Sequence, residues 1–166
     1  MRSRQQFLDE YAQSHMHPAN QVIHMICVPA IFIATAALGW VVPLGHLAGV
    51  SAGWARWINL ASLGALPVLL FYARLGLPSL LAGLGWLAAS FAACAAIQAA
   101  GAPLLWIAAA VWIAAWAVQF YGHKLEGAKP SFADDLLFLL VGPLFVQDKL
   151  VRLLRTGSIH PIARVG

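Results

Sequence analysis

Four long apolar segments, separated by short polar stretches, dominate the pattern of this sequence. They cover about residues 24–43, 57–73, 78–99 and 103–121. A helix that crosses a membrane needs about 20 residues, within a range of about 17–25. All four segments qualify, the second least comfortably, so the pattern predicts an all-α, integral membrane four-helix bundle. We expect a single domain over residues 1–166.

A shorter patterned segment precedes the first span. Residues 3–14 place Phe7, Leu8 and Tyr11 at helical spacing. This predicts a short N-terminal helix that rests one face on the membrane or on the rest of the protein. Pro18 disfavours helical geometry at the residue before it and suits the first turn of a new helix. We therefore expect the chain to break just before Pro18.

The C-terminal region is patterned as well. Ser131 followed by Asp134 resembles a capping box that opens a helix. The apolar residues that come next are too few to span a membrane, and we expect Gly142-Pro143 to interrupt them. Residues 144–156 then alternate apolar and charged side chains. That alternation predicts an amphipathic helix in the cytoplasmic interface of the membrane.

The composition agrees with a membrane protein. Of the 166 residues, 61% are hydrophobic and 10% are charged, and the mean hydropathy is +0.78. A soluble domain carries about 25% charged residues. The polar start of the chain does not resemble a cleaved signal peptide, so we expect it to be retained. Cys27 and Cys94 lie inside apolar segments without CxxC spacing and imply no disulfide framework.

The basic residues predict the orientation of the bundle. With four spans, the N-terminus, the loop at 74–77 and the C-terminal tail share one side of the membrane. That side carries nine Lys and Arg, against Arg56 alone on the other: Arg2, Arg4, Arg74, Lys124, Lys129, Lys149, Arg152, Arg155 and Arg164. This positive-inside pattern places both termini in the cytoplasm, and the composition suggests a bacterial inner membrane. Because these charges lie beside apolar segments, they favour contact with anionic membrane lipid and argue against a nucleic-acid partner.

Two polar islands lie at the cytoplasmic ends of the spans. The first contains His15, Asn20 and His24, and the second, after the last span, contains His123 and Glu126. Asn20 and His24 are four residues apart and share a helix face, and His123 and Glu126, three apart, do the same. Imidazole and carboxylate groups at a membrane boundary are costly without partners. We therefore expect the fold to bring the two islands together as a metal site.

Histidines with one carboxylate suit Fe(II), Zn(II) or Mn(II), and such a set with open positions is what oxygen activation at non-haem iron requires. The candidate metal ligands are His15, His24, His123 and Glu126. The side chains that would orient these ligands are Asn20, Tyr11 and Gln119.

Each candidate also has a plainer explanation. A single histidine at a membrane interface is often only a headgroup contact, and Glu126 is compatible with a counter-ion for Lys124 or Lys129. His46 and His160 are placed away from the cluster and are expected to be incidental. The sequence contains no HExxH, P-loop or GxSxG motif, and it lacks the paired histidine boxes of the membrane di-iron hydroxylases.

Two motifs carry a resemblance to a known family. The first is Y-x3-H-x4-N-x3-H-x4-P, formed by Tyr11, His15, Asn20, His24 and Pro29. The second is FxGH followed by E, P and a D-[ND]-L step, formed by Phe120, Gly122, His123, Glu126, Pro130, Asp134, Asp135 and Leu136, with Pro143 and Phe145 closing the pattern. Together they resemble the small membrane protein family of the fungal Fe(II)-dependent 2-hydroxy fatty acid dioxygenase of fatty acid α-oxidation. The resemblance covers nearly the whole chain.

The resemblance implies an enzyme that uses Fe(II) and O2 to shorten a long-chain 2-hydroxy fatty acid by one carbon. It carries the family's iron-binding histidines over to His15, His24 and His123. In the family the glutamate follows the motif histidine by four residues, whereas Glu126 follows His123 by three. Lys124 or Lys129 is a candidate partner for the substrate carboxylate, as a point charge.

Two other functions stay open on the sequence alone. One is a non-catalytic membrane protein for lipid binding or transport, in which the histidine cluster is structural. The middle of the spans offers only weak polar groups such as Thr35 and Ser90, which counts against a polar-solute pathway. The other is a zinc-dependent lipid hydrolase with the same ligands. Chain-length preference, a fourth ligand and a homo-oligomeric state are also left open.

Overall fold

The computed structural model describes residues 2–45, 47, 49–127, 129–130 and 135–157. These residues form seven helices and no strand, which confirms the all-α prediction: α1 (Arg4–Gln13), α2 (Pro18–Trp40), α3 (Ala52–Ala55), α4 (Leu60–Arg74), α5 (Leu77–Ala99), α6 (Leu104–Glu126) and α7 (Phe138–Thr156). The expected capping box at Ser131 and Asp134, and the histidines His46 and His160, lie outside the described residues.

Three of the described helices are long and apolar enough to cross a membrane. α2, α5 and α6 have 23 residues each, which is about 35 Å of helix against a hydrocarbon core of about 30 Å. α4, the expected second span, has only 15 residues, or about 22 Å. It begins at Leu60 because Asn59 caps it: the Asn59 side chain accepts from the Ser62 backbone, and the Ser62 side chain accepts from the Asn59 backbone.

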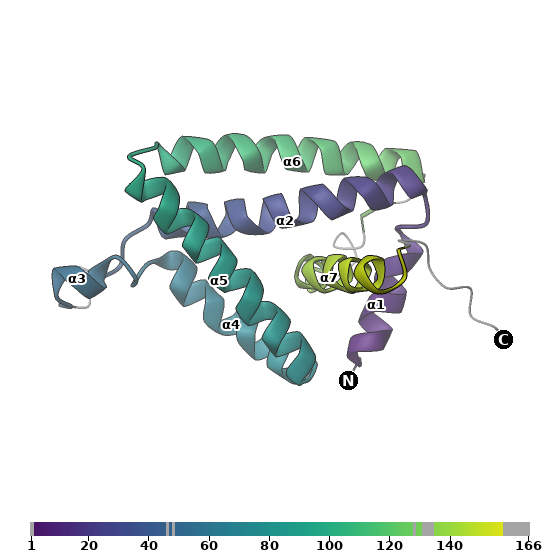
Figure 1. Cartoon of the computed structure of the whole chain (residues 1–166), viewed down its shortest axis with the longest axis horizontal. Coiled ribbons are helices and arrows are strands. Elements are labelled where there is room, and N and C mark those ends of the chain that lie inside the picture. Colours follow the sequence, from purple (N-terminus) through teal and green to yellow (C-terminus); the bar gives the residue numbers. More distant parts are fainter. Residues whose placement is uncertain (1, 46, 48, 128, 131–134, 158–166) are drawn as a thin grey trace.

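The four apolar helices α2, α4, α5 and α6 run in alternating directions (Figure 1). α2 and α6 lie side by side along most of their length, while α4 and α5 form an inclined pair against α2. Small residues permit the closest approaches. A Cβ added at Gly122 of α6 would lie 2.4 Å from the Asn20 side chain of α2, and one at Gly83 would lie 2.0 Å from the Tyr72 ring. The alternation leaves the start of α2 and the end of α6 at the same end of the bundle, beside α1 and α7.

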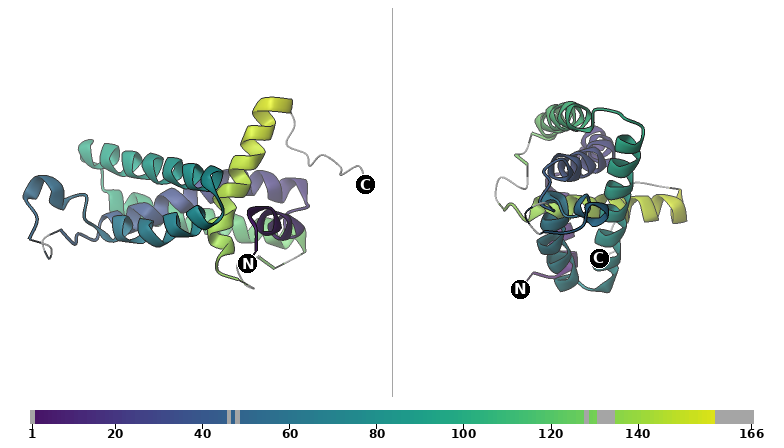
Figure 2. Two further views of the ribbon diagram at one scale, coloured as in Figure 1. Left: turned by 90° about the horizontal axis from the view of Figure 1, so that it is seen from below. Right: turned by 90° about the vertical axis from the view of Figure 1, so that its left-hand side faces the viewer.

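α1 packs on the protein through the predicted face. Phe7, Leu8 and Tyr11 are all buried, and the Ser3 side chain caps the first turn of α1. Their partners come mainly from α7, which lies crosswise to the long helices (Figure 2). Arg4 of α1 also donates to Asp148 of α7 at 2.5 Å. α1 and α7, far apart in the sequence, are thus joined.

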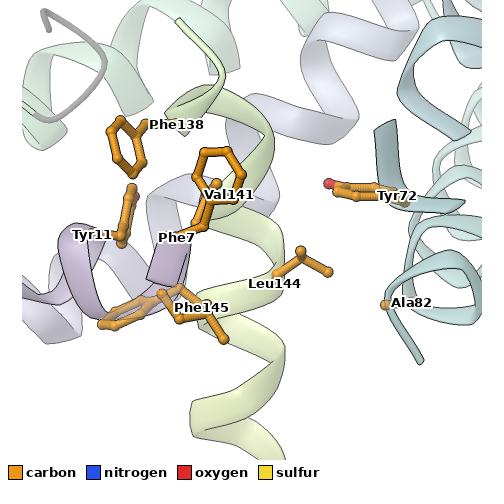
Figure 3. Close-up of a cluster of buried hydrophobic side chains, with 9 residues drawn as sticks. Phe7, Tyr11, Tyr72, Ala82, Phe138, Val141, Leu144 and Phe145 are labelled. Carbon is orange, nitrogen blue, oxygen red and sulfur yellow. The ribbon is translucent and has the colours of Figure 1, made fainter. Parts of the chain in front are cut away.

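α7 corrects one expectation. Gly142-Pro143 does not interrupt the chain, and a single 19-residue helix runs through it. Proline removes one hydrogen bond from a helix, but tertiary packing holds this one: the half of α7 that contains Pro143 is inserted between α1 and the α4–α5 pair (Figure 3). Val141 and Leu144 are buried there, with Leu144 directed toward Tyr72. Only the second half of α7 has the exposed amphipathic character that the sequence predicts.

Candidate metal centre

The three histidines of the two polar islands meet at one point. His15 lies between α1 and α2, His24 in α2 and His123 in α6, and their exposed fractions are 1%, 0% and 5%. The ring centroid of His15 lies 4.0 Å from that of His24 and 5.1 Å from that of His123. Each residue offers a ligand atom within 4.8 Å of the others. The packing of α2 on α6 and the break before Pro18 create this convergence.

Backbone carbonyls orient two of the rings. Nδ1 of His15 lies 2.6 Å from the Tyr11 carbonyl oxygen, and Nδ1 of His24 lies 3.0 Å from the Asn20 carbonyl oxygen. A carbonyl only accepts, so both Nδ1 atoms carry the proton and both Nε2 atoms are left with a lone pair. These Nε2 atoms face each other at 2.7 Å. Two lone pairs at that distance need a shared proton or a cation between them.

The surroundings favour neutral imidazoles. Burial, followed by the neighbouring His24, lowers the pKa of His15 to about 2. The Tyr11 ring stacks on the His15 ring, with centroids 4.1 Å apart and planes 12° apart, and burial raises the pKa of the Tyr11 phenol. A divalent metal binds the neutral form of histidine, so His15 is held in a ligating state at physiological pH.

Glu126 stands beside this cluster and holds the chain around it. Its carboxylate accepts from the backbone N–H groups of Met16 at 2.7 Å and His17 at 2.8 Å, and from Nδ2 of Asn20 at 3.0 Å. His17 is the N-cap of α2, so the carboxylate also lies at the positive end of that helix. Among the described residues, the group able to hold a metal contains the three histidines and not Glu126.

The other predicted site residues are either buried near the histidines or exposed at the surface. Asn20 is fully buried and contacts Glu126 through its side chain and His24 through its carbonyl. Gln119 lies one turn before His123, and its buried Oε1 has no hydrogen-bond partner among the described residues. Lys124 and Lys129 are exposed.

A chain of hydrogen bonds from α7 also reaches the backbone of His15, and the sequence analysis did not predict it. Nζ of Lys149 donates to Oε1 of Gln21 at 2.7 Å, and Nε2 of Gln21 donates to the His15 carbonyl at 2.8 Å. Lys149 is buried, and its Nζ atom lies 5.1 Å from the centre of the Phe145 ring. Burial lowers the pKa of its ammonium group. The spacing of the sequence does indicate the buried position of Lys149, because this residue follows Phe145 by four and so lies on the apolar face of the same helix.

An elongated apolar cavity of about 650 Å³ leads away from the cluster. Its size lies within the range of about 300–1,000 Å³ that small-molecule sites occupy. Tyr11, His15, Gln119 and His123 line the end at the cluster, and the remaining lining is largely apolar. Two of the three clustered histidines, His15 and His123, therefore lie at the end of a space that accepts an apolar molecule, and His24 lies directly behind them against His15. Such a set fits a divalent transition metal whose other positions face a substrate.

The comparisons with known proteins agree with this geometry. The family model described as 2-hydroxy-palmitic acid dioxygenase Mpo1-like matches residues 1–154. No curated protein and no solved structure matches the chain. The matched range includes the three histidines, the cavity and nearly all of α7. The chain belongs to the Mpo1-like family.

Proposed function

We propose that this protein is an Fe(II)-dependent dioxygenase that uses O2 to shorten a long-chain 2-hydroxy fatty acid by one carbon. The observation that carries the proposal is the convergence of three buried histidines, two of which line the end of an apolar cavity. The family description, which names a 2-hydroxy-palmitic acid dioxygenase, supports the substrate class. We propose a bacterial inner membrane as the location, with the site on the cytoplasmic side.

The donor set fits the metal. We propose that His15, His24 and His123 hold Fe(II) through ring nitrogens, because the facing Nε2 atoms of His15 and His24 require a positive charge between them. Bound iron would supply the activation of O2 and the polarisation of the substrate's head group. Glu126 is proposed to hold the turn that carries His15, since both of its oxygens already accept hydrogen bonds.

The chain's own residues would bind and orient the substrate. Oε1 of Gln119 can accept from the 2-hydroxyl group, because it is buried at the cluster end of the cavity and has no partner among the described residues. Lys124 directly follows His123, and we propose that Lys124 or Lys129 pairs with the substrate carboxylate. The apolar lining would exclude water from the reacting carbon.

The overall reaction balances with O2 as the only oxidant. The C1–C2 bond breaks, C2 becomes the carboxyl carbon of the shortened acid, and C1 leaves as carbon dioxide together with one water molecule. The four electrons lost by C1 and C2 reduce O2. No second reductant is needed.

Product analysis tests the proposal. The full chain, purified in detergent and loaded anaerobically with Fe(II), receives 2-hydroxypalmitate and O2, and the products are identified by mass spectrometry. We expect an acid one carbon shorter, absent with His123→Ala. His17→Asn is the matched control, because His17 is exposed and Asn preserves the N-cap of α2.

The other outcomes separate the alternatives. Unchanged substrate with bound Fe(II) would reject this substrate. A hydrolysis product formed with Zn(II) would favour a zinc-dependent lipid hydrolase. If the wild type binds no metal and His123→Ala folds normally, the result would favour a lipid-binding or transport protein in which the histidine cluster is structural.

A further inference from the structure

We propose that the apolar cavity holds the acyl chain of the substrate inside the bundle and that Gly64 sets the length of chain it accepts. This inference rests on the proposed function and concerns the part of the protein that determines the length of the substrate it accepts. It assigns the cavity to one occupant, a single extended acyl chain whose head group lies at the histidine cluster.

Residues of four helices, α2, α4, α6 and α7, form most of the walls of the cavity, and those of α2, α4 and α6 recur at helical spacing. α2 contributes a stripe at helical spacing, which includes Val28, Ile31, Phe32, Thr35 and Gly39. α6 contributes Trp112, Trp116, Gln119 and His123, and α4 contributes Leu60, Ala61, Gly64, Ala65 and Val68. Each set follows one face of its helix, so the cavity runs along the helices.

The cavity has a polar end and an apolar end. His123 and Gln119 lie at the cluster, whereas Trp112 lies three turns back along α6. At that depth the side chains of Trp112 and Thr35 form a hydrogen bond with each other: Nε1 of Trp112 donates to Oγ1 of Thr35 at 3.1 Å. The far part of the cavity therefore presents a surface suited to hydrocarbon.

The length of the cavity agrees with an acyl chain. From Val28 to Gly39 the α2 wall extends about 16 Å, at about 1.5 Å per residue. This equals about half of the hydrocarbon core of about 30 Å that two layers of lipid chains fill. A fatty acyl chain with its carboxylate at His15 and His123 therefore fits along this wall.

Two helices are in direct contact at the far end of the cavity. A Cβ added at Gly39 would lie only 2.9 Å from the Ala61 backbone nitrogen, so α2 and α4 touch there. Gly64 lies one turn nearer the cluster on α4. A Cβ added at Gly64 would meet nothing within 4 Å, although the residue lines the cavity. A side chain at position 64 would therefore enter the space that the end of the acyl chain occupies.

Binding of two acids of different length tests the proposal. Affinities of 2-hydroxypalmitate and the shorter 2-hydroxylaurate are measured by fluorescence quenching of the Trp residues, on the Zn(II)-loaded full chain in nanodiscs. A leucine at position 64 displaces at least about two methylene groups, so Gly64→Leu should weaken binding of the longer acid by about tenfold or more. Binding of the shorter acid should change by less than about twofold, and Gly64→Ala should give an intermediate loss for the longer acid.

Gly85→Leu is the matched control. Gly85 is also an exposed helical glycine whose added Cβ would meet nothing within 4 Å, but it lines a different cavity. This variant should bind both acids as the wild type does. Equal losses for both acids in Gly64→Leu, or no loss for either, would overturn the assignment of the cavity to the acyl chain.

The outcomes distinguish this inference from the proposed function. If the wild type produces the shortened acid but position 64 does not change length selection, only the inference fails. Retention of a membrane phospholipid in wild type, lost in Gly64→Leu without any change in acid binding, would assign the cavity to lipid instead. If the wild type neither binds nor converts either acid, the proposed function fails as well.

Discussion

Replacing Glu126 by glutamine tests whether this residue holds the metal-binding turn or the metal itself. The carboxylate joins the end of α6 to the turn between α1 and α2, through Met16, His17 and Asn20. His15 immediately precedes that turn, and His123 lies three residues before Glu126. Glu126→Gln keeps the shape of the side chain but replaces one oxygen by an NH2 group that faces hydrogen-bond donors.

The size of the effect follows from the three hydrogen bonds. At least one is lost and the others lose their charge, and a hydrogen bond to a charged group contributes about 1.5–3 kcal/mol against about 0.5–1.5 for a neutral one. Met16 and His17 are exposed, so water replaces part of the loss. We expect the metal affinity to fall by about tenfold to a hundredfold, as is typical when a group that supports a ligand is removed.

The measurement is a Co(II) titration of the full chain, followed by its visible spectrum and by chelator competition. Weaker affinity with an unchanged Co(II) spectrum would support a positioning role, because the three histidines remain. A spectrum that reports one ligand fewer would show that Glu126 binds the metal. An unchanged affinity would show that Glu126 neither binds the metal nor holds the histidines that do. Glu10→Gln, which changes an exposed carboxylate paired with Arg2, should leave both quantities unaltered.

Three further substitutions have definite expected outcomes. Gly122→Ala inserts a methyl group 2.4 Å from the Asn20 side chain, so the bundle should lose about 1–3 kcal/mol and bind Co(II) more weakly in the same titration. Tyr72→Phe removes the hydrogen bond to the Leu140 carbonyl at 2.8 Å, and thermal unfolding in detergent should report a loss of about 1 kcal/mol. Gln119→Met keeps the volume but removes the buried amide, so the preference for 2-hydroxypalmitate over palmitate in binding competition should fall by about fivefold or more.

The sequence predicted the elements that depend on local chemistry. Pro18 starts α2 where proline is favoured, and the helical spacing of Phe7, Leu8 and Tyr11 identified the buried face of α1. The approach of His15, His24 and His123 followed from an even number of apolar helices, which returns the chain to the same end of the bundle. Each of these inferences used only spacing and direction.

Features that depend on packing between distant segments were not predictable in the same way. Whether Glu126 faces a metal or the Met16 N–H depends on the rotation of α6 against α2, which Gly122 sets by its contact with Asn20. α7 continues through Pro143 because the core surrounds it, although local propensity favours a break. Asn59 caps α4 and starts it at Leu60, three residues after the predicted start of the second span.

The connection between α1 and α7 has a consequence for biosynthesis. α1 leaves the ribosome long before α7, yet Phe7 packs on Phe138 and Arg4 pairs with Asp148. Until α7 emerges, the segment that carries His15 lacks these partners, and His123 itself is made almost a hundred residues after His24. The proposed centre is therefore complete only after α7 has been made. Chains that stop before His123 would carry two of the histidines without the third, so the proposed metal centre would form only in chains that include α6.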